Sequence, residues 1–295
     1  MHVTAHTNQR LDQDVVVRNA HPEDADSCAR IFYDAFESIA VGHRFPVEVP
    51  SREFADFWIA DALGRAGIIG LVAERDGNVL GGAFVDERGP VAGIGPVAVA
   101  PAAQNDGIGR ALMQAALERE RDAAGVRLVQ TAYHYRSLAL YAKLGFVVRE
   151  TLSVLQGRPP AIITPEREVR AASEDDLAGC GTLCVRVHGH QRTRELQDAI
   201  AAGTARVIEG PGGLCGYATG FGYGWHAVAE TNHDLTALLA SAEQFIGLGI
   251  LVPARNAELL RWGLAHGLRI VQQSTLMTRG LYNEPAGAYL PSIVY

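Results

Sequence analysis

The residues best suited to chemistry stand at 104–112, where the sequence QNDGIGRAL follows the apolar run GPVAVAP at 95–101. Two glycines, Gly107 and Gly109, fall where a helical pattern begins. Glycine has no Cβ atom, so a ligand can come close to the backbone, and a helix start offers free N–H groups at the positive end of its dipole. The segment predicts a site for a negatively charged group such as a phosphate. Two glycines alone can also serve only to shape a strand–helix corner.

This turn lacks the Lys-Ser/Thr of a Walker loop and the three glycines of the dinucleotide fingerprint. It resembles instead the acetyl-CoA signature of the GNAT N-acetyltransferase family, Gln/Arg-x-x-Gly-x-Gly/Ala after a strand, at Gln104, Gly107 and Gly109. A second family element falls on HYRSLALYAKLGF at 134–146, and the resemblance is strong over 15–156. The residues that match in this second element are Ser137, Leu140, Tyr141, Lys143, Gly145 and Phe146.

The resemblance implies a role for each matched position. The N–H groups of the turn would hold the CoA pyrophosphate, and the preceding strand would pair with the pantetheine arm. A splayed or bulged strand would leave the amide of Val97 or Ala98 to polarise the thioester carbonyl. Tyr141 would be the general acid that protonates the leaving thiolate; its alternative is an aromatic side chain packed on the sheet. The implied cofactor-binding residues are Val97, Ala98, Val99, Gln104, Asn105, Asp106, Gly107, Ile108, Gly109, Arg110, His134 and Ser137.

One position departs from the family pattern, because His134 stands where the family often has Asn. A histidine can contact the cofactor, act as a base near neutral pH, or simply end a strand. The base that deprotonates the acceptor amine is not evident. Asp86, Glu87 and His43 are candidates only because their segments are expected to flank the acceptor cleft. Since a chain of water molecules can also remove the proton, no base is assigned.

The elements that position these residues follow an α/β pattern with a largely antiparallel sheet. The segment ERDGNVLGG contains Asp76-Gly77-Asn78, which predicts a hairpin turn. Pro22 and the acids after it predict the start of the first helix. The expected strands lie at 15–20, 69–87 in two parts, 91–99, 126–133 and 146–155, and the expected helices near 22–36, 51–63, 108–121 and 136–144.

The chain then repeats itself. VRNAHPEDADSC from Val17 aligns with VRAASEDDLAGC from Val169, and 134–146 aligns with NAELLRWGLAHGL at 256–268. Two matches in the same order favour a tandem duplication. The sequence therefore predicts two tandem GNAT-like α/β domains, each with a mixed, largely antiparallel sheet flanked by helices. The expected divisions are an acetyl-CoA-binding domain at 1–157, a proline-containing linker at 158–167 and a degenerate domain at 168–295.

The second copy has lost the chemistry of the first. Where the glycine turn would align it reads ETNHDLTAL, with Glu230, His233 and Leu235, and Gly263 stands at the position of Tyr141. Asn256 and Gly267 are kept, which concerns the fold rather than the reaction. We expect a catalytically silent half that supports the first or covers its acceptor site.

Composition limits the partners. The formal charge of −7 argues against a nucleic-acid partner, since phosphate binding usually needs a basic face. No apolar stretch has the length of a membrane span or the form of a signal peptide. Four scattered cysteines show no disulfide framework, so a cytoplasmic protein is expected. Cys180, Cys184 and His188 have the spacing of one helix face, but Gly181 and Gly189 weaken that helix and no metal is expected. The aromatic run GYATGFGYGWHA at 216–227 reads as two strands.

The resemblance implies transfer of acetyl from acetyl-CoA directly to a primary amine, with no covalent acyl-enzyme. The expected acceptor is a small molecule or an amino acid, and the chain is expected to be a monomer or homodimer. A protein N-terminus or lysine is an alternative acceptor, and an acetyl-CoA-binding regulator without turnover is the alternative function. The presence of Tyr141 favours the enzyme, because binding alone needs no general acid.

Overall fold

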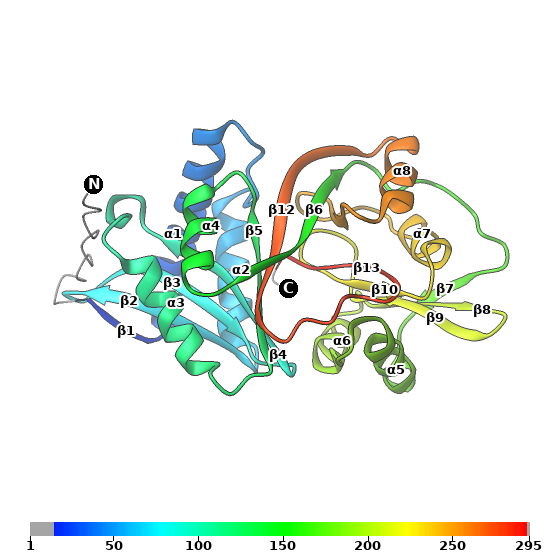
Figure 1. Ribbon diagram of the computed structural model, residues 1–295, viewed down its shortest axis with the longest axis horizontal. Coiled ribbons are helices and arrows are strands. Elements are labelled where there is room, and N and C mark those ends of the chain that lie inside the picture. The colour runs from blue at the N-terminus through cyan, green and yellow to red at the C-terminus, as the bar shows by residue number, and fades with distance from the viewer. Residues whose placement is uncertain (1–14, 294–295) are drawn as a thin grey trace, which may run out of the picture.

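The computed structural model describes residues 15–293 and contains two β-sheets flanked by helices (Figure 1). In the N-terminal half a strand and two helices come first, three strands follow, and the rest alternates. Its elements are β1 (Val16–Asn19), α1 (Ala25–His43), α2 (Arg52–Gly64), β2 (Ile68–Arg75), β3 (Asn78–Asp86), β4 (Val91–Val99), α3 (Ile108–Arg119), β5 (Gly125–Thr131), α4 (Tyr135–Lys143) and β6 (Val147–Gln156).

The C-terminal half begins in the same order, with a strand, two helices and further strands. Its elements are β7 (Glu168–Ala171), α5 (Leu177–His188), α6 (Thr193–Ala201), β8 (Arg206–Gly210), β9 (Gly213–Ala218), β10 (Ala227–Ala229), α7 (Asn232–Ala240), β11 (Ile250–Pro253), α8 (Ala257–Ala265), β12 (Arg269–Gly280) and β13 (Ala288–Leu290). Short 3-10 turns precede α1, α3 and α5.

Local signals in the sequence explain several of these elements. Arg75 pairs with Asn78 across a two-residue loop in which Asp76 and Gly77 have φ of 51° and 75°, so the expected hairpin is confirmed. Ser51 starts α2 by accepting a hydrogen bond from the backbone N–H of Phe54 at 3.2 Å. The first helix ends at His43, well beyond the expected end near 36.

The same ion-paired turn opens each half. Arg18 on β1 donates to Asp24 at 2.7 Å, and Asp24 accepts from the N–H of His21 at 2.8 Å. Arg170 on β7 donates to Asp176 at 2.8 Å, and Asp176 accepts from the N–H of Ser173 at 2.8 Å. The arginine holds the pKa of each aspartate below its usual range, to about 2 for Asp176. These are the residues that the sequence alignment paired, so the tandem organisation is visible in three dimensions.

The larger sheet is shared by the two halves. Its strand order is β1-β2-β3-β4-β5-β12-β6-β11, and only β4 and β5 run parallel. The C-terminal strand β12 lies between β5 and β6: Thr275 faces Gln130 on one side and Thr151 on the other. The smaller sheet has the order β13-β10-β9-β8-β7. A division of the chain at 157 and 168 therefore does not divide the sheets, because β11 and β12 complete the first one.

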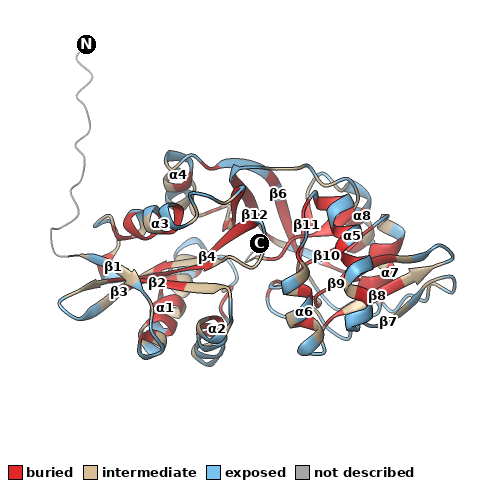
Figure 2. Cartoon of the chain, turned by 90° about the horizontal axis from the view of Figure 1, so that it is seen from below, coloured by how far each residue is buried: buried red, intermediate tan, exposed pale blue. Residues whose placement is uncertain are grey.

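Helices cover both faces of the larger sheet. Figure 2 shows α1 and α2 on one face and α3 and α4 on the other. Val72 and Phe84 belong to the core under α1 and α2, whereas their neighbours Ala73 and Val85 belong to the core under α3. Because both faces are buried, these strands read as almost continuous apolar runs. The smaller sheet is covered by α5 and α6 on one face and by α7 on the other, and α8 packs against α7 and against β11 and β12 of the larger sheet (Figure 1).

A chain that ends at residue 157 should not fold cooperatively. It lacks β12, so β5 and β6 lose the strand that joins them, and the core loses Leu276 and Met277, which are each 1% exposed. We expect no sigmoidal transition in thermal unfolding followed by circular dichroism, and recovery of that transition when residues 158–295 are co-expressed as a second chain. A cooperative transition of the fragment alone would contradict this expectation.

Candidate active site

The site is built on a gap between two strands. β4 and β5 pair only through residues 91–93 and 125–127, after which they diverge. Beyond that point β4 pairs with β3 alone, and a bulge places Gly95 and Pro96 opposite Phe84. The edge of β4 that faces β5 therefore has no strand partner from 94 to 99 among the described residues. The strand is both splayed and bulged, as the family resemblance implied.

The register decides which amide faces the gap. Ala100 donates its N–H to the carbonyl of Leu80 at 2.9 Å, and groups two residues apart in a strand point the same way. The N–H of Ala98 therefore faces β3, and those of Val97 and Val99 face the gap. The carbonyl of Val99 points to the same side as its N–H, away from β3, and accepts a hydrogen bond from Gln104 Nε2 at 3.2 Å. Of the two amides that the sequence left open, Val97 is the one directed into the gap.

The glycine turn joins the end of β4 to α3. Asn105 and Gly107 have φ of 79° and 84°, and Gly107 is the N-cap of the helix. The first backbone bond of the helix runs from Ala111 N–H to the carbonyl of Gly107 at 3.0 Å. The N–H groups of residues 104–110 donate to no acceptor within 15–293. Several free amides therefore cluster at the positive end of α3, as an anion site requires.

The fold requires glycine at only one of the two positions in the turn. Gly107 has a left-handed backbone, which other residues adopt only at a cost. A Cβ atom on Gly109 would lie 3.7 Å from Val99 Cγ2 and 3.8 Å from Leu140 Cδ2, which are ordinary contacts. The fold thus tolerates a side chain at 109. Nothing in the described fold requires glycine at this position.

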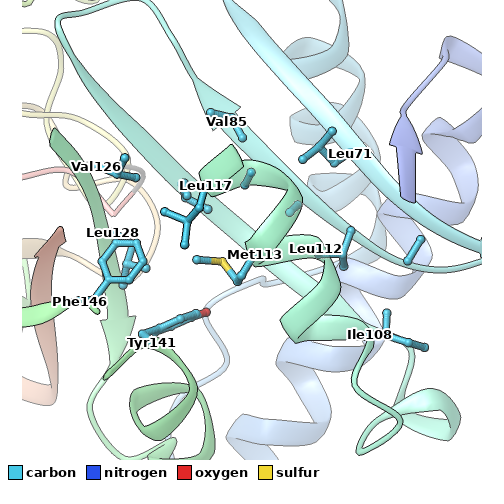
Figure 3. Close-up of a cluster of buried hydrophobic side chains, with 14 of the residues drawn as sticks. Leu71, Val85, Ile108, Leu112, Met113, Leu117, Val126, Leu128, Tyr141 and Phe146 are labelled. Carbon is cyan, nitrogen blue, oxygen red and sulfur yellow. The ribbon is translucent and has the colours of Figure 1, made fainter. Parts of the chain in front are cut away.

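Tyr141 lies in the core between α3, α4 and the sheet (Figure 3). It is 8% exposed, and its ring meets that of Phe146 edge-on with centroids 6.1 Å apart. The hydroxyl is at the end of the ring directed away from Phe146 (Figure 3) and forms no hydrogen bond within the described chain. Burial raises the pKa of Tyr141 to about 12, so the phenol keeps its proton at neutral pH. The ring packs on the sheet, and its hydroxyl remains available to a ligand.

His134 and Ser137 lie where α4 begins. His134 is the N-cap residue, and burial, then the nearby Arg136, lowers the pKa of its imidazole. It is therefore neutral at pH 7. Ser137 Oγ lies 3.0 Å from Gln130 Oε1 and donates to the carbonyl of His134 at 2.9 Å. Arg136 donates to Asn105 Oδ1, which ties α4 to the glycine turn.

The acidic residues considered as bases lie away from the open end of the gap. Asp86 faces Gly93, where β4 and β5 are still paired, and it forms an ion pair with Arg88 at 2.5 Å. Glu87 is ion-paired with Arg119. The structure instead brings Glu48 to the carboxyl end of β5, a residue that no sequence signal singled out. It is a lone acid in a proline-rich loop, and its neighbours come from distant segments.

The corresponding places in the second half are filled. Thr231 caps α7 by accepting from the N–H of Asp234 at 3.2 Å, and Leu235 behind it is fully buried. Gly263, at the position of Tyr141, is packed so closely that a Cβ atom would lie 2.5 Å from Leu155 Cδ2. No space is left for a second glycine turn or a second tyrosine ring.

The cysteine and histidine side chains of α5 lie in the protein core. Cys180, Cys184 and His188 are buried on α5, and burial raises the pKa of Cys180 to about 12. Residues 15–293 contain no group of three or more His, Cys, Asp or Glu side chains arranged to hold a metal ion. None of the helices in this range is both long and apolar enough to span a membrane.

Comparison with known proteins supports the resemblance. The model of the acetyltransferase (GNAT) family matches residues 29–146. A putative acetyltransferase from Pyrococcus horikoshii is 21% identical with a TM-score of 0.72, and the match covers 99% of this chain and 97% of that one. A GCN5-related N-acetyltransferase from Sphaerobacter thermophilus is 15% identical with a TM-score of 0.62, covering 93% and 98%.

A tandem GNAT protein from the clavulanic acid biosynthesis pathway is 14% identical with a TM-score of 0.56. The match covers 92% of this chain and all of that protein. A search of curated proteins gave no match. At these identities the solved structures show the fold, and they show it for both halves.

The two glycines should respond differently to alanine. Gly107→Ala is expected to lower the free energy of unfolding by about 1–2 kcal/mol, because the left-handed backbone disfavours a Cβ atom. Gly109→Ala should leave it unchanged or raise it by up to about 1 kcal/mol, since alanine is the better helix former. Urea unfolding of both variants measures the difference. Equal losses would mean that Gly109 is also required by the fold.

Proposed function

Because the chain belongs to the GNAT family of acetyltransferases, in its tandem type, we propose that it transfers acetyl from acetyl-CoA directly to a primary amine of a small molecule or amino acid. The observation that carries the proposal is the convergence of three features in one half. These are the open edge of β4, the free amides of the glycine turn and the buried hydroxyl of Tyr141.

Acetyl-CoA would occupy the gap between β4 and β5. The amides from Gln104 to Arg110 would hold the pyrophosphate, and Val97 and Val99 would pair with the pantetheine arm as an added strand does. His134 and Ser137 stand beside this path at the start of α4. We assign cofactor binding to residues 1–157, with 158–167 as a linker, and a supporting role without chemistry to 168–295.

The reaction needs an amide donor and a proton donor, and the gap supplies both. The neutral amine attacks the thioester carbonyl, and the N–H of Val97 stabilises the oxyanion that forms. When the intermediate collapses, the C–S bond breaks and the thiolate takes a proton from Tyr141. Burial raises the pKa of the Cys28 thiol to about 12, so this buried cysteine is no nucleophile, which agrees with direct transfer.

Acetyl-CoA should bind to one site per chain. Gly109→Leu should abolish binding, because the leucine would fill the space of the phosphates, while its Cβ atom makes only ordinary contacts. Calorimetric titration of both proteins measures the effect, with thermal unfolding as the check that the variant is folded. Two equivalent sites in the unaltered chain, or unchanged binding by Gly109→Leu, would contradict the assignment.

Tyr141→Phe should lower kcat by about a hundredfold, or about 3 kcal/mol, because a phenylalanine of the same shape cannot protonate the thiolate. The affinity for acetyl-CoA should change much less, since the lost contact acts mainly in the transition state. The measurement is release of free thiol from acetyl-CoA with a panel of amines, amino acids and peptides.

Each other result has a distinct meaning. Unchanged turnover would leave Tyr141 as a packing residue, and a parallel loss of binding would show that its ring positions the cofactor. An unaltered protein that binds acetyl-CoA and acetylates nothing in the panel would favour the regulator over the enzyme.

A further inference from the structure

A carboxylate from the N-terminal half is buried against the C-terminal half. Glu48 lies in the loop between α1 and α2, with 9% of its surface exposed. Thr131 Oγ1 and Gln272 Nε2 both donate to Glu48 Oε1, at 2.6 and 2.9 Å. The hydroxyl of Tyr223 accepts from Gln272 Nε2 at 3.2 Å, and as a third donor to the carboxylate it lowers the pKa of Glu48. Gln272 on β12 and Tyr223 between β9 and β10 thus reach across to a residue of the first half.

The charge of Glu48 has no partner of opposite sign. All three donors are neutral, and no Lys, Arg or His within residues 15–293 offsets the carboxylate. Other buried carboxylates are paired with an arginine, such as Glu150 with Arg255 and Asp234 with Arg167. Desolvation by burial raises the pKa of Glu48 despite the hydrogen bonds. A buried and uncompensated carboxylate is costly, so a cationic ligand would supply what the chain does not.

The hydrogen-bonding capacity around Glu48 is also incomplete. A carboxylate offers about four lone-pair sites, so three donors leave room for one more. Gln272 is 3% exposed, and its Oε1 accepts no hydrogen bond from the described residues. An ammonium group carries three donors and could satisfy both acceptors. The orphaned Gln272 oxygen and the unpaired Glu48 charge point to the same kind of ligand.

Glu48 lies at the level where acetyl transfer would occur. Its partner Thr131 is the last residue of β5. Gly93 pairs with Arg127 in the parallel register of β4 and β5. When this register is continued and the bulge in β4 is allowed for, Gln130 and Thr131 lie level with Val97. The carboxylate is therefore on the far side of the gap from the amide that faces the thioester carbonyl.

Aromatic rings line the loop side of Glu48. Phe45 stacks on Tyr133 with ring centroids 4.1 Å apart and planes 6° apart, and the ring of His43 lies 5.3 Å from Tyr133. Burial and the nearby Glu48 charge raise the pKa of Tyr133, so its ring stays neutral. Aromatic faces attract ammonium groups within about 6 Å. An ammonium group beside Glu48 could therefore also contact an aromatic face.

We propose that Glu48 is the counter-ion and proton acceptor of the acceptor's ammonium group, and that Tyr223 and Gln272 of the C-terminal half hold its carboxylate in place. This rests on the proposed acetyl transfer and narrows the acceptor. A carboxylate next to the amine would be repelled by Glu48. The acceptor is therefore a primary amine without an adjacent carboxylate, in preference to a free α-amino acid.

The proposed reaction releases one proton overall. The ammonium group gives one proton to the Glu48 carboxylate, and the neutral nitrogen forms the new C–N bond. The thiolate takes the proton of Tyr141 as the C–S bond breaks. The proton that the nitrogen then loses restores Tyr141, and Glu48 releases its proton to solvent. The net products are the amide, CoA with a free thiol and one proton.

Two tyrosines around Glu48 keep their protons near neutral pH. Tyr223 faces it from the C-terminal half and Tyr133 from the segment after β5, and burial raises the pKa of both. His43, at the end of α1, faces Tyr133. Because Glu48 must be ionised to bind the ammonium group, we expect an acidic limb in the pH profile that Glu48→Gln removes.

The decisive variant is Glu48→Gln, which keeps the shape and removes the charge. At pH 7 we expect kcat/KM for the amine to fall by about 10² to 10³, with acetyl-CoA affinity unchanged. The loss should shrink as pH approaches the pKa of the free amine, because neutral amine then needs no proton acceptor. Glu150→Gln is the matched control, a buried carboxylate outside the site, and should keep the activity and pH profile of the unaltered chain.

Two further measurements test the role of the C-terminal half and the predicted type of acceptor. Tyr223→Phe removes a donor that lowers the pKa of Glu48, so the acidic limb of kcat/KM should move to higher pH. A matched pair of acceptors, phenylalanine and phenylethylamine, should differ by at least about tenfold in favour of the amine without the carboxylate.

Three results would overturn the proposal while the proposed function stands. They are a Glu48→Gln loss that is the same at every pH, unchanged activity of Glu48→Gln, and equal rates for phenylalanine and phenylethylamine. If the unaltered protein binds acetyl-CoA but none of the amines tested causes release of thiol, the proposed function fails, and the role of Glu48 fails with it.

Discussion

The pairing of β5 is the constraint on which the site depends. All seven residues of β5 pair with β12 on one edge, whereas only residues 125–127 pair with β4 on the other. One side of the gap is thus fixed by a strand of the C-terminal half, and the other is free to diverge. The open edge of β4 and its unpaired amides follow from this asymmetry, since a β5 that paired with β4 along its length would close the gap.

The sequence could predict the parts of the site that are local. The glycine turn and the α4 segment with Tyr141 each lie within a short run of residues, and their pattern carries both the structure and the expected chemistry. The hairpin at Asp76-Gly77 and the duplicated Arg-Asp turns were equally readable. In each case the determining contacts span a few residues, so residue type and spacing contain them.

The parts that could not be predicted depend on distant contacts. β12 is separated from β5 and β6 by more than a hundred residues. The residue pattern of a strand sets which face is buried, but it does not show which strands pair with it. Glu48 is an ordinary acid in a loop until Thr131, Gln272 and Tyr223 converge on it. No motif records such a convergence, because each partner lies on a different element. Sharing a sheet between the two halves therefore created both the features that sequence patterns missed.

The same sharing explains why only one half kept its chemistry. Leu155 on β6 pairs with Ile250 on β11 and Ile270 on β12, so it is fixed in the shared sheet. Its side chain lies where a side chain at Gly263, the counterpart of Tyr141, would project. A second tyrosine would displace Leu155 and disturb the strands that carry the first site. The shared sheet thus leaves no space for a tyrosine at 263. In our proposal the C-terminal half acts instead through the residues that it brings to Glu48.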